Sequence, residues 1–492
     1  MDSTVVRIET GLVKGVQEGD VLAWRGIPFA QTPRFRAPVP VAPWNGIRDA
    51  SSFGPIPWQT KISPKIPNPI KPSRMSESLL CLNVVRPARE AQQLRPVLVY
   101  IYGGGNRVGF SDQFPGTTLA VRGDLVYVTF NYRLGVFGFV DFSSFSTADH
   151  PFDSNPGTRD QLAALQWVQR NIAMFGGDPE NVTIWGESAG ALAVTTLLGM
   201  PSARGLFQRA ISQSSPANNA YHADTAAMWA RRYLSILGLD QQSVGELHTL
   251  PPERLVAAGY RFSLATPDEQ PGALSVSPVI GGDLLLQHPI AAIRDGNGNK
   301  VPLLIGTCAN EGTTFAKIIP DLATSPARLD KMFAMNKPGA KERVVAAYPG
   351  YPAPGVAAQM GGDFSFWAPS IEIARAQAMY APVWMYRFDL APRLFRLLGL
   401  NATHGIDTFL PFAEPQVGTL QGILGGKQDI KAVAQRMQAD WISFVQQGKP
   451  RPEWPQYSPP QRLTLIFGRT DRVESDPQAE KREAWEQYAD YR

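Results

Sequence analysis

The stretch NVTIWGESAGALAV, residues 181–194, changes character at a single serine. β-Branched and aromatic residues favour a strand before Gly186, and the alanine- and leucine-rich run after Ser188 favours a helix. A serine between two glycines at such a junction is either part of an ordinary tight turn or a nucleophile held on a strained bend. The G-x-S-x-G pattern is short and the chain has 44 glycines, so the rest of the sequence must decide.

The flanking sequence predicts strands that alternate with helices. A helix is expected from a capping box of Thr158 and Gln161 through Ile172, closed by two glycines at 176–177. The range from about 217 to 300 also looks mostly helical. Apolar runs predict strands over residues 95–105, 124–135, 181–185, 301–307, 382–390 and 463–468. This alternation indicates an α/β fold with a mostly parallel sheet and helices on its faces.

Acyl transfer at a serine also needs N–H donors for the developing oxyanion. Glycines 103–105 follow a predicted strand, and Ala189 opens the helix after Ser188, so both places can supply backbone donors. A phosphate cradle is the rival interpretation of the glycines. It fits poorly, because their spacing is not G-x-G-x-x-G and no G-K-[ST] follows.

A serine hydroxyl needs a histidine as base and a carboxylate to orient that histidine. Of five histidines, His404 lies in a loop after a strand, beside a glycine and late in the chain. Glu311 follows the strand predicted at 301–307, at the end where sheet enzymes collect functional groups. From these residues alone, both remain candidates among several histidines and acids.

Composition excludes some classes of protein. Of the 492 residues 44% are hydrophobic and 18% charged, as in ordinary globular proteins, and the net charge of +4 without a basic run does not indicate nucleic-acid binding. No apolar run is long enough to predict a membrane span, and residues 1–15 do not look like a secretory signal. Only Cys81 and Cys308 are present, so we expect no disulfide framework and a cytoplasmic location.

These stretches together resemble the type-B carboxylesterase family, the cholinesterase-like branch of the α/β-hydrolases. The resemblance covers nearly the whole chain, and the elbow segment is its most specific part. It is carried, in the family order, by GIPFAQTPRFRAP, PWNGIRDASSFGP, NYRLGVFGF, DQLAALQWVQRNIAMFGGDPENVTIWGESAG and ADWISFVQQGKP with WPQY. It implies the α/β-hydrolase fold in one catalytic domain over 1–492, with a helical insertion at about 217–300 and a regulatory-like helical portion at about 320–460.

The resemblance also implies site residues. Ser188 would be the nucleophile, Glu311 the acid and His404 the base, with Ser214 supporting this triad. The oxyanion hole would be built from backbone N–H groups of Gly104, Gly105 and Ala189. Candidates for the pocket wall, each with core packing as the alternative role, are Asn106, Trp185, Phe315, Phe366, Trp367 and Phe412.

The sequence departs from the family pattern at several places. Leu79 stands where secreted relatives have a cysteine, so their first disulfide cannot form here. The loop near Pro33 is about four residues short, which would widen the entrance. Asn106 replaces an aromatic next to the glycines, and the Thr408-Phe409 pair alters the spacing after His404.

The expected activity is hydrolysis of a small-molecule carboxylic ester through an acyl-enzyme on Ser188, without cofactor or metal. Cleavage of amides, carbamates or thioesters by the same residues stays open, as does a long-chain lipase. A binding or adhesion relative without chemistry is the alternative from another class, disfavoured because all three triad positions are present. The sequence leaves the substrate and the choice between monomer and dimer undetermined.

Overall fold

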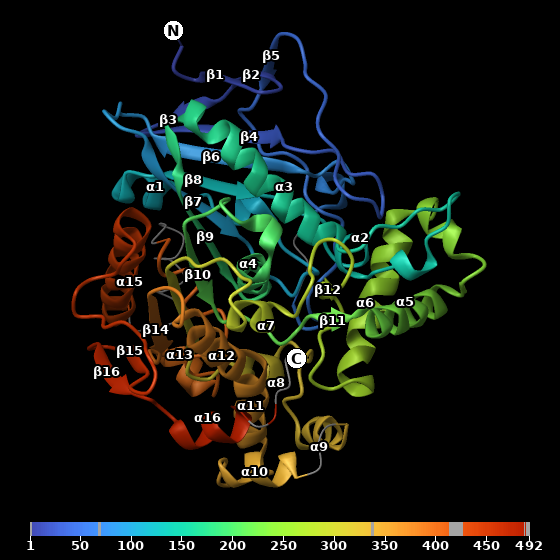
Figure 1. Ribbon diagram of the computed structural model, residues 1–492, viewed down its shortest axis with the longest axis vertical. Coiled ribbons are helices and arrows are strands. Elements are labelled where there is room, and N and C mark those ends of the chain that lie inside the picture. Colours follow the sequence, from blue (N-terminus) through green and yellow to red (C-terminus); the bar gives the residue numbers. More distant parts are fainter. Residues whose placement is uncertain (1, 67–69, 336–338, 413–426, 487, 489–492) are drawn as a thin grey trace.

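The computed structural model describes residues 2–66, 70–335, 339–412, 427–486 and 488, drawn in Figure 1. An eleven-stranded sheet runs through the molecule. In spatial order its strands are β16 (Arg472–Ser475), β15 (Leu463–Phe467), β14 (Val383–Phe388), β13 (Leu303–Cys308), β10 (Arg209–Gln213), β9 (Gly177–Glu187), β7 (Arg95–Ile101), β8 (Val126–Phe130), β6 (Cys81–Pro87), β4 (Val21–Pro28) and β3 (Val16–Glu18).

The seven strands from β15 to β8 are parallel, and those at both edges are antiparallel. The central strands are rich in apolar residues and buried along their whole length: every residue of β8 (VYVTF) and β13 (LLIGTC) is buried. Such runs are typical of parallel strands covered on both faces. The predicted mostly parallel α/β sheet is therefore present, and its parallel strands end at one common edge.

Helices cover both faces of the sheet. One group, α3 (Pro156–Asn171), α4 (Ala189–Gly199) and α12 (Ala368–Gln377), packs on one face, and α1 (Thr117–Gly123) and α15 (Lys427–Gln447) pack on the other.

The predicted capping box at Thr158 is wrong. The helix begins at Pro156 after Asn155, so Thr158 lies inside it. Proline suits the first helical position, because its missing N–H would have no partner there.

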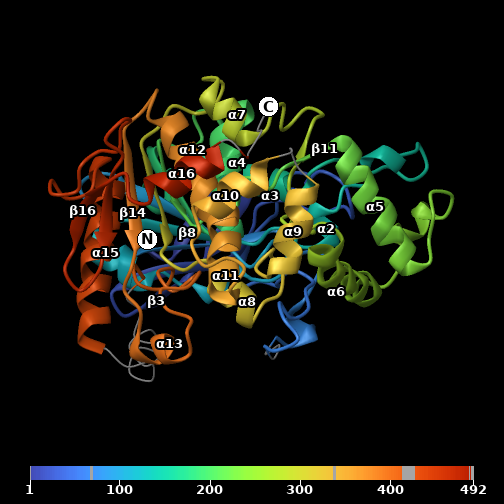
Figure 2. The same ribbon diagram turned by 90° about the horizontal axis from the view of Figure 1, so that it is seen from below.

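The remaining elements lie mainly beyond the carboxyl edge of the parallel strands and at the amino-terminal end (Figures 1 and 2). A small separate sheet within the first 49 residues of the chain holds β1 (Val5–Ile8), β2 (Gly11–Lys14) and β5 (Ile47–Asp49). The other helices and strands are β11 (Tyr221–His222), α5 (Ala223–Leu237), α6 (Pro252–Glu269), β12 (Val279–Ile280), α7 (Pro289–Arg294), α8 (Gly312–Lys317), α9 (Pro326–Ala334), α10 (Ala340–Ala346), α11 (Pro354–Gly362), the π-helical turn Asp363–Trp367, α13 (Arg393–Leu397) and α16 (Ala479–Glu486).

The range 217–300 holds helices α5, α6 and α7 with the short strands β11 and β12, and α5 and α6 stand well out from the sheet (Figure 1). The range 320–460 holds helices together with β14 of the main sheet. The predicted single catalytic domain, with an insertion at about 217–300 and a regulatory-like portion at about 320–460, stays a prediction. In the part of the chain that the structure describes, no helix is both long and apolar enough to cross a membrane.

Candidate functional site

The bend between β9 and α4 holds Ser188 in an unusual backbone conformation. Its φ of 57° and ψ of −124° are strained for a residue with a side chain. The Ser188 N–H donates to the carbonyl of Gln213 on β10 at 2.9 Å, and the Ser188 carbonyl accepts from Leu192 inside α4. The strain is therefore held by the sheet on one side and by the helix on the other.

Two glycines allow this bend. A Cβ at Gly190 would collide with the carbonyl oxygen of Ile101 on β7, and a Cβ at Gly186 would collide with the backbone of Gly190. Only residues without side chains let the helix start so close to the two strands. The glycines of the G-x-S-x-G pattern thus have a steric role that the pattern alone only suggests.

Glu311 follows β13 and is buried at the same edge of the sheet. Its Oε1 accepts from the hydroxyl of Ser214 and from the N–H of Cys308, both at 2.6 Å. Ser214 follows β10, the strand between those that precede Ser188 and Glu311. These two donors leave Oε2 of Glu311 facing a third group.

That third group is His404. Its Nδ1 lies 2.5 Å from Oε2 of Glu311, and its Nε2 lies 2.9 Å from Oγ of Ser188. The loop that carries it is anchored because Asn310 and Thr403 form a β-bridge beside Glu311. A hydroxyl, an imidazole and a carboxylate joined in this order can activate the hydroxyl as a nucleophile.

The predicted oxyanion donors lie beside Ser188. Gly104 and Gly105 have φ of 113° and 62°, and a Cβ at Gly104 would collide with the carbonyl of Val108. Their N–H groups donate to no acceptor among the described residues. Ala189 is the first residue of α4, so its N–H has no partner within the helix. All three N–H groups are thus available for a ligand.

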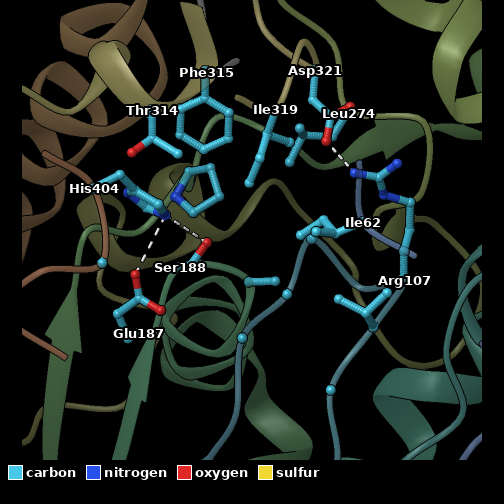
Figure 3. Close-up of a pocket in the computed structure, with 18 of the residues that line it drawn as sticks. Ile62, Arg107, Glu187, Ser188, Leu274, Thr314, Phe315, Ile319, Asp321 and His404 are labelled. Atoms are coloured by element: carbon cyan, nitrogen blue, oxygen red, sulfur yellow. Dashed lines mark hydrogen bonds and ion pairs between the residues drawn. The ribbon is translucent and has the colours of Figure 1, made fainter. Parts of the chain in front are cut away.

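A second carboxylate, which the sequence analysis missed, contacts His404. Oε1 of Glu187 lies 3.4 Å from Nε2 of His404, and burial raises the pKa of Glu187 to about 7 (Figure 3). Burial also lowers the pKa of His404, but the charges of Glu311 and Glu187 outweigh it and raise the pKa above its usual value. The position of Glu187 directly before Ser188 was the sequence signal that could have identified it as a site residue.

Asp407, three residues after His404, is a further buried carboxylate that sequence reasoning did not single out. It accepts from the hydroxyl of Tyr386 at 2.7 Å and from the amide of Gln213 at 3.0 Å, and the thiol of Cys308 lies 3.4 Å away. Burial raises its pKa, while Tyr386 and Gln213 oppose the rise. The network ties the loop after His404 to β10, β13 and β14.

A cavity of about 300 Å³ opens over Ser188 and His404. Two of the predicted wall residues line it: the rings of Phe315 and Phe366 lie 5.1 and 4.3 Å from the imidazole of His404. Gly104, Gly105 and Ala189 also border it, as do Thr408 and Phe409.

The other four predicted wall residues do not line this cavity. Asn106 is buried and its amide faces the carbonyl of Val276 at 3.4 Å. Trp185 stacks on Phe412 inside the core and donates to Gln213, and Trp367 belongs to the same main core. These aromatic rings therefore pack in the core. Pro33, in the short loop, also lies outside the cavity lining.

Both cysteines are buried free thiols, and burial raises the pKa of Cys81 to about 12. No cluster of three or more histidine, cysteine or acidic side chains within the described ranges could hold a metal ion. The absence of metal and cofactor remains a prediction.

Comparison with known proteins gives a consistent family. A model of the carboxylesterase family matches residues 2–346 and 354–485. The chain is 37% identical to the para-nitrobenzyl esterase of Bacillus subtilis (strain 168), over 98% of each chain. It is 33% identical to the fumonisin B1 esterase of Sphingopyxis macrogoltabida, over 93% of this chain and 85% of the relative.

Solved structures agree. A para-nitrobenzyl (PNB) esterase structure superposes with a TM-score of 0.86 at 35% identity, covering 98% of this chain and 99% of the other. A carboxylesterase of Geobacillus stearothermophilus gives 0.83 at 33% identity, with coverage of 98% and 100%. From the matched family model and these full-length relatives, this chain belongs to the carboxylesterase family and is a carboxylic ester hydrolase with the α/β-hydrolase fold.

Proposed function

We propose that Ser188, His404 and Glu311 are the catalytic triad of this ester hydrolase. The observation that carries the proposal is the unbroken chain of contacts from Oγ of Ser188 to Nε2 of His404 at 2.9 Å and from Nδ1 to Oε2 of Glu311 at 2.5 Å. These three side chains come from separate loops, yet all follow strands of the parallel sheet. Their geometry matches the requirement for nucleophile, base and orienting acid.

In this mechanism the hydroxyl of Ser188 attacks the ester carbonyl carbon while Nε2 of His404 takes its proton. Glu311 holds the imidazole with Nδ1 protonated and stabilises the imidazolium that forms. The imidazolium then protonates the departing alcohol, which leaves an acyl group on Ser188. Water, deprotonated by the same imidazole, attacks the acyl-enzyme and releases the carboxylic acid.

The oxyanion of each tetrahedral intermediate is proposed to accept hydrogen bonds from the N–H groups of Gly104, Gly105 and Ala189. Their glycine-rich loop and helix start are fixed before substrate arrives, so no reorganisation opposes the reaction. Loss of one such donor typically slows turnover by about 100- to 1000-fold.

The proposed substrates are small esters with apolar parts. Phe315, Phe366 and Leu274 border the cavity, and the match to a para-nitrobenzyl esterase supports an aromatic or otherwise apolar group. Amides, carbamates and thioesters remain alternatives that need the same residues. We also propose a cytoplasmic location, with which two buried free thiols are compatible.

Replacing the proposed nucleophile tests this function. Ser188→Ala should lower kcat/KM for p-nitrophenyl acetate by roughly 10³- to 10⁶-fold, and a fluorophosphonate probe should label the wild-type protein at Ser188 alone. The control variant Ser202→Ala changes an exposed serine on the turn after α4 and should retain both activity and labelling. Wild-type turnover in folded Ser188→Ala would refute the assignment of the nucleophile.

A further inference from the structure

A partly buried ion pair lies in the wall of the cavity, on the side away from His404 (Figure 3). Nη2 of Arg107 donates to Oδ2 of Asp321, and the two side chains are 12% and 11% exposed. The two residues are 214 positions apart in sequence and belong to different loops. Ile62 and Leu274 lie near them, so the pair is a polar feature set into an apolar surface.

Arg107 is held close to the proposed oxyanion loop. Its N–H donates to the carbonyl of Gly104 at 3.1 Å, which closes a turn around Gly105. A Cβ placed on Gly105 would lie only 3.5 Å from Nε and 3.7 Å from Nη2 of Arg107. The guanidinium therefore lies alongside the loop that is proposed to bind the reacting carbonyl, within reach of the same bound ester.

Asp321 is fixed by its own loop. The guanidinium of Arg328 donates from one nitrogen to the carbonyls of Pro320 and Leu322, at 2.9 and 3.2 Å. The N–H of Asp321 donates to the carbonyl of Ile319 at 2.8 Å. The backbone on both sides of Asp321 is therefore tied down, and Asp321 belongs to the cavity lining.

The pair has unused hydrogen-bonding capacity. A guanidinium has five N–H donors, and the side chain of Arg107 makes its hydrogen bond to Asp321 through Nη2. Oδ1 of Asp321 is buried and has no hydrogen-bond partner among the residues that the structure describes. A buried carboxylate oxygen without a donor is costly, so a ligand that supplies one gains affinity there.

We propose that Arg107 and Asp321 form a polar subsite for an uncharged substituent of the ester that both donates and accepts hydrogen bonds, such as a hydroxyl or a primary amide. The substituent would donate to Oδ1 of Asp321 and accept from a free N–H of Arg107. This inference rests on the proposed function, since the subsite selects among esters cleaved at Ser188.

The charges of the subsite explain why the substituent should be neutral. The pair carries one positive and one negative group, so it offers no net charge to an ion. A carboxylate on the ester would have to compete with Asp321 for Arg107, and an ammonium would have to compete with Arg107 for Asp321, so neither ion gains a net attraction there. A methyl group would leave Oδ1 of Asp321 without a donor. The expected order is therefore hydroxyl or amide first, with methyl and carboxylate behind.

Matched esters test the subsite. One series of p-nitrophenyl esters carries a terminal methyl, hydroxyl or carboxylate on acyl chains of increasing length, and a second series carries the same groups on the alcohol side. At the length that reaches the pair, we expect kcat/KM of the hydroxyl ester to exceed that of the methyl ester by about 10- to 100-fold. The double variant Arg107→Met/Asp321→Leu should bring this ratio close to one.

The control variant Arg232→Met/Glu269→Leu removes an exposed ion pair and should keep the wild-type ratio. Should the double variant fail to fold, Asp321→Asn gives a second readout. It leaves Arg107 without its counter-charge, so the carboxylate ester should gain at least tenfold relative to the hydroxyl ester. No gain in this ratio would contradict the proposal.

Other outcomes would also overturn the subsite. These are a hydroxyl-to-methyl ratio of one or less at every length in both series, an unchanged ratio in the double variant, or a wild-type preference for the carboxylate ester. If p-nitrophenyl acetate is still cleaved in a Ser188-dependent way, only the subsite fails. If wild-type protein cleaves no ester at all, the proposed function fails with it.

Discussion

Glu187 places a second carboxylate against the imidazole that is proposed to act as base. While charged, it favours the imidazolium form of His404, which cannot take a proton from Ser188. Activity should therefore rise as the pH increases through the pKa of His404. Glu187 has an opposite use as well, since its charge would stabilise the imidazolium that forms in the transition state.

Glu187→Gln should move the acidic limb of the pH–kcat/KM profile to lower pH by about 1 unit, because removing a nearby negative charge lowers the pKa of His404. The same variant should lower kcat at its plateau, since the imidazolium loses a stabilising charge. A profile from about pH 5 to about pH 10.5 with p-nitrophenyl acetate, corrected for spontaneous hydrolysis, measures both effects because it extends above the raised pKa of His404. Glu180→Gln changes an exposed residue of the same strand and is the control; an unmoved limb in Glu187→Gln would contradict the prediction.

Ser214→Ala should lower kcat/KM by about tenfold, because Glu311 loses one of two donors that orient it and a hydrogen bond to a charged group contributes about 1.5–3 kcal/mol. Ser212→Ala is a matched control on β10, the strand that Ser214 follows, since the hydroxyl of Ser212 is buried and has no hydrogen-bond partner among the described residues. Steady-state kinetics on both variants decide the matter. Equal activities would mean that Cys308 alone suffices to hold Glu311.

The location of a site residue could be predicted from the sequence where it depends only on which strand the residue follows. Ser188, Glu311 and His404 each follow a predicted strand, and parallel strands end at one edge, so their meeting could be expected. Side-chain direction could not be foreseen. Asn106 follows the glycines directly but points into the core, and Arg107, one residue later, reaches the cavity.

At the scale of elements, the start of α4 depends on a close approach to the sheet. Gly190→Ala should greatly lower the yield of folded protein or its melting temperature, because the added Cβ would strike the backbone carbonyl of Ile101, which cannot move without shifting β7. Thermal melts followed by circular dichroism test this.

Gly355→Ala is the control for that experiment. Gly355 lies in the first turn of α11, where a Cβ would meet no atom of the described part of the chain within 4 Å. Alanine also favours the helix over glycine by about 0.5–1 kcal/mol, so this variant should be neutral or slightly more stable. Comparable melting temperatures for the two variants would show that the contact near Ile101 can relax.

Strands were more predictable than helix limits and sheet edges. Fully buried parallel strands give long apolar runs, which is why the runs at 301–307 and 382–390 correspond to β13 and β14. The start of α3 was misplaced because Thr158 imitates a capping box. The antiparallel edge strands are short and half-exposed, so their pairing is set by contacts distant in sequence.

For the molecule as a whole, Arg133 joins three parts of the chain that the sequence keeps far apart. It forms a buried ion pair with Asp160 of α3, at 2.7 Å, and donates to the carbonyls of Pro33 and Arg36 in the amino-terminal region. The short loop near Pro33 is thereby fixed to the sheet and to α3. Sequence could not reveal this link, because nothing local pairs residues about a hundred positions apart.

Arg133→Met should lower the free energy of unfolding by about 3–5 kcal/mol, because it leaves the carboxylate of Asp160 buried without its partner. Arg170→Met is the control: Arg170 pairs with Glu9 at the surface, so its loss should cost less than about 1 kcal/mol. Urea unfolding curves measured at pH 7 give both values. Similar losses in the two variants would mean that water reaches Asp160.

Because β13, β10, β9 and β7 are neighbours in the sheet, the groups proposed for catalysis and the segments that form the cavity wall come from different parts of the fold. The sheet edge supplies Ser188 and Glu311 through short connections after β9 and β13, and His404 through the longer loop after β14. The cavity wall comes partly from longer segments outside the main sheet, such as those bearing Leu274 and Asp321. Exchanging those segments between homologous enzymes should transplant selectivity while reactivity survives. Substrate preference in this fold can therefore diverge through changes in single loops while the sheet and its catalytic groups stay the same.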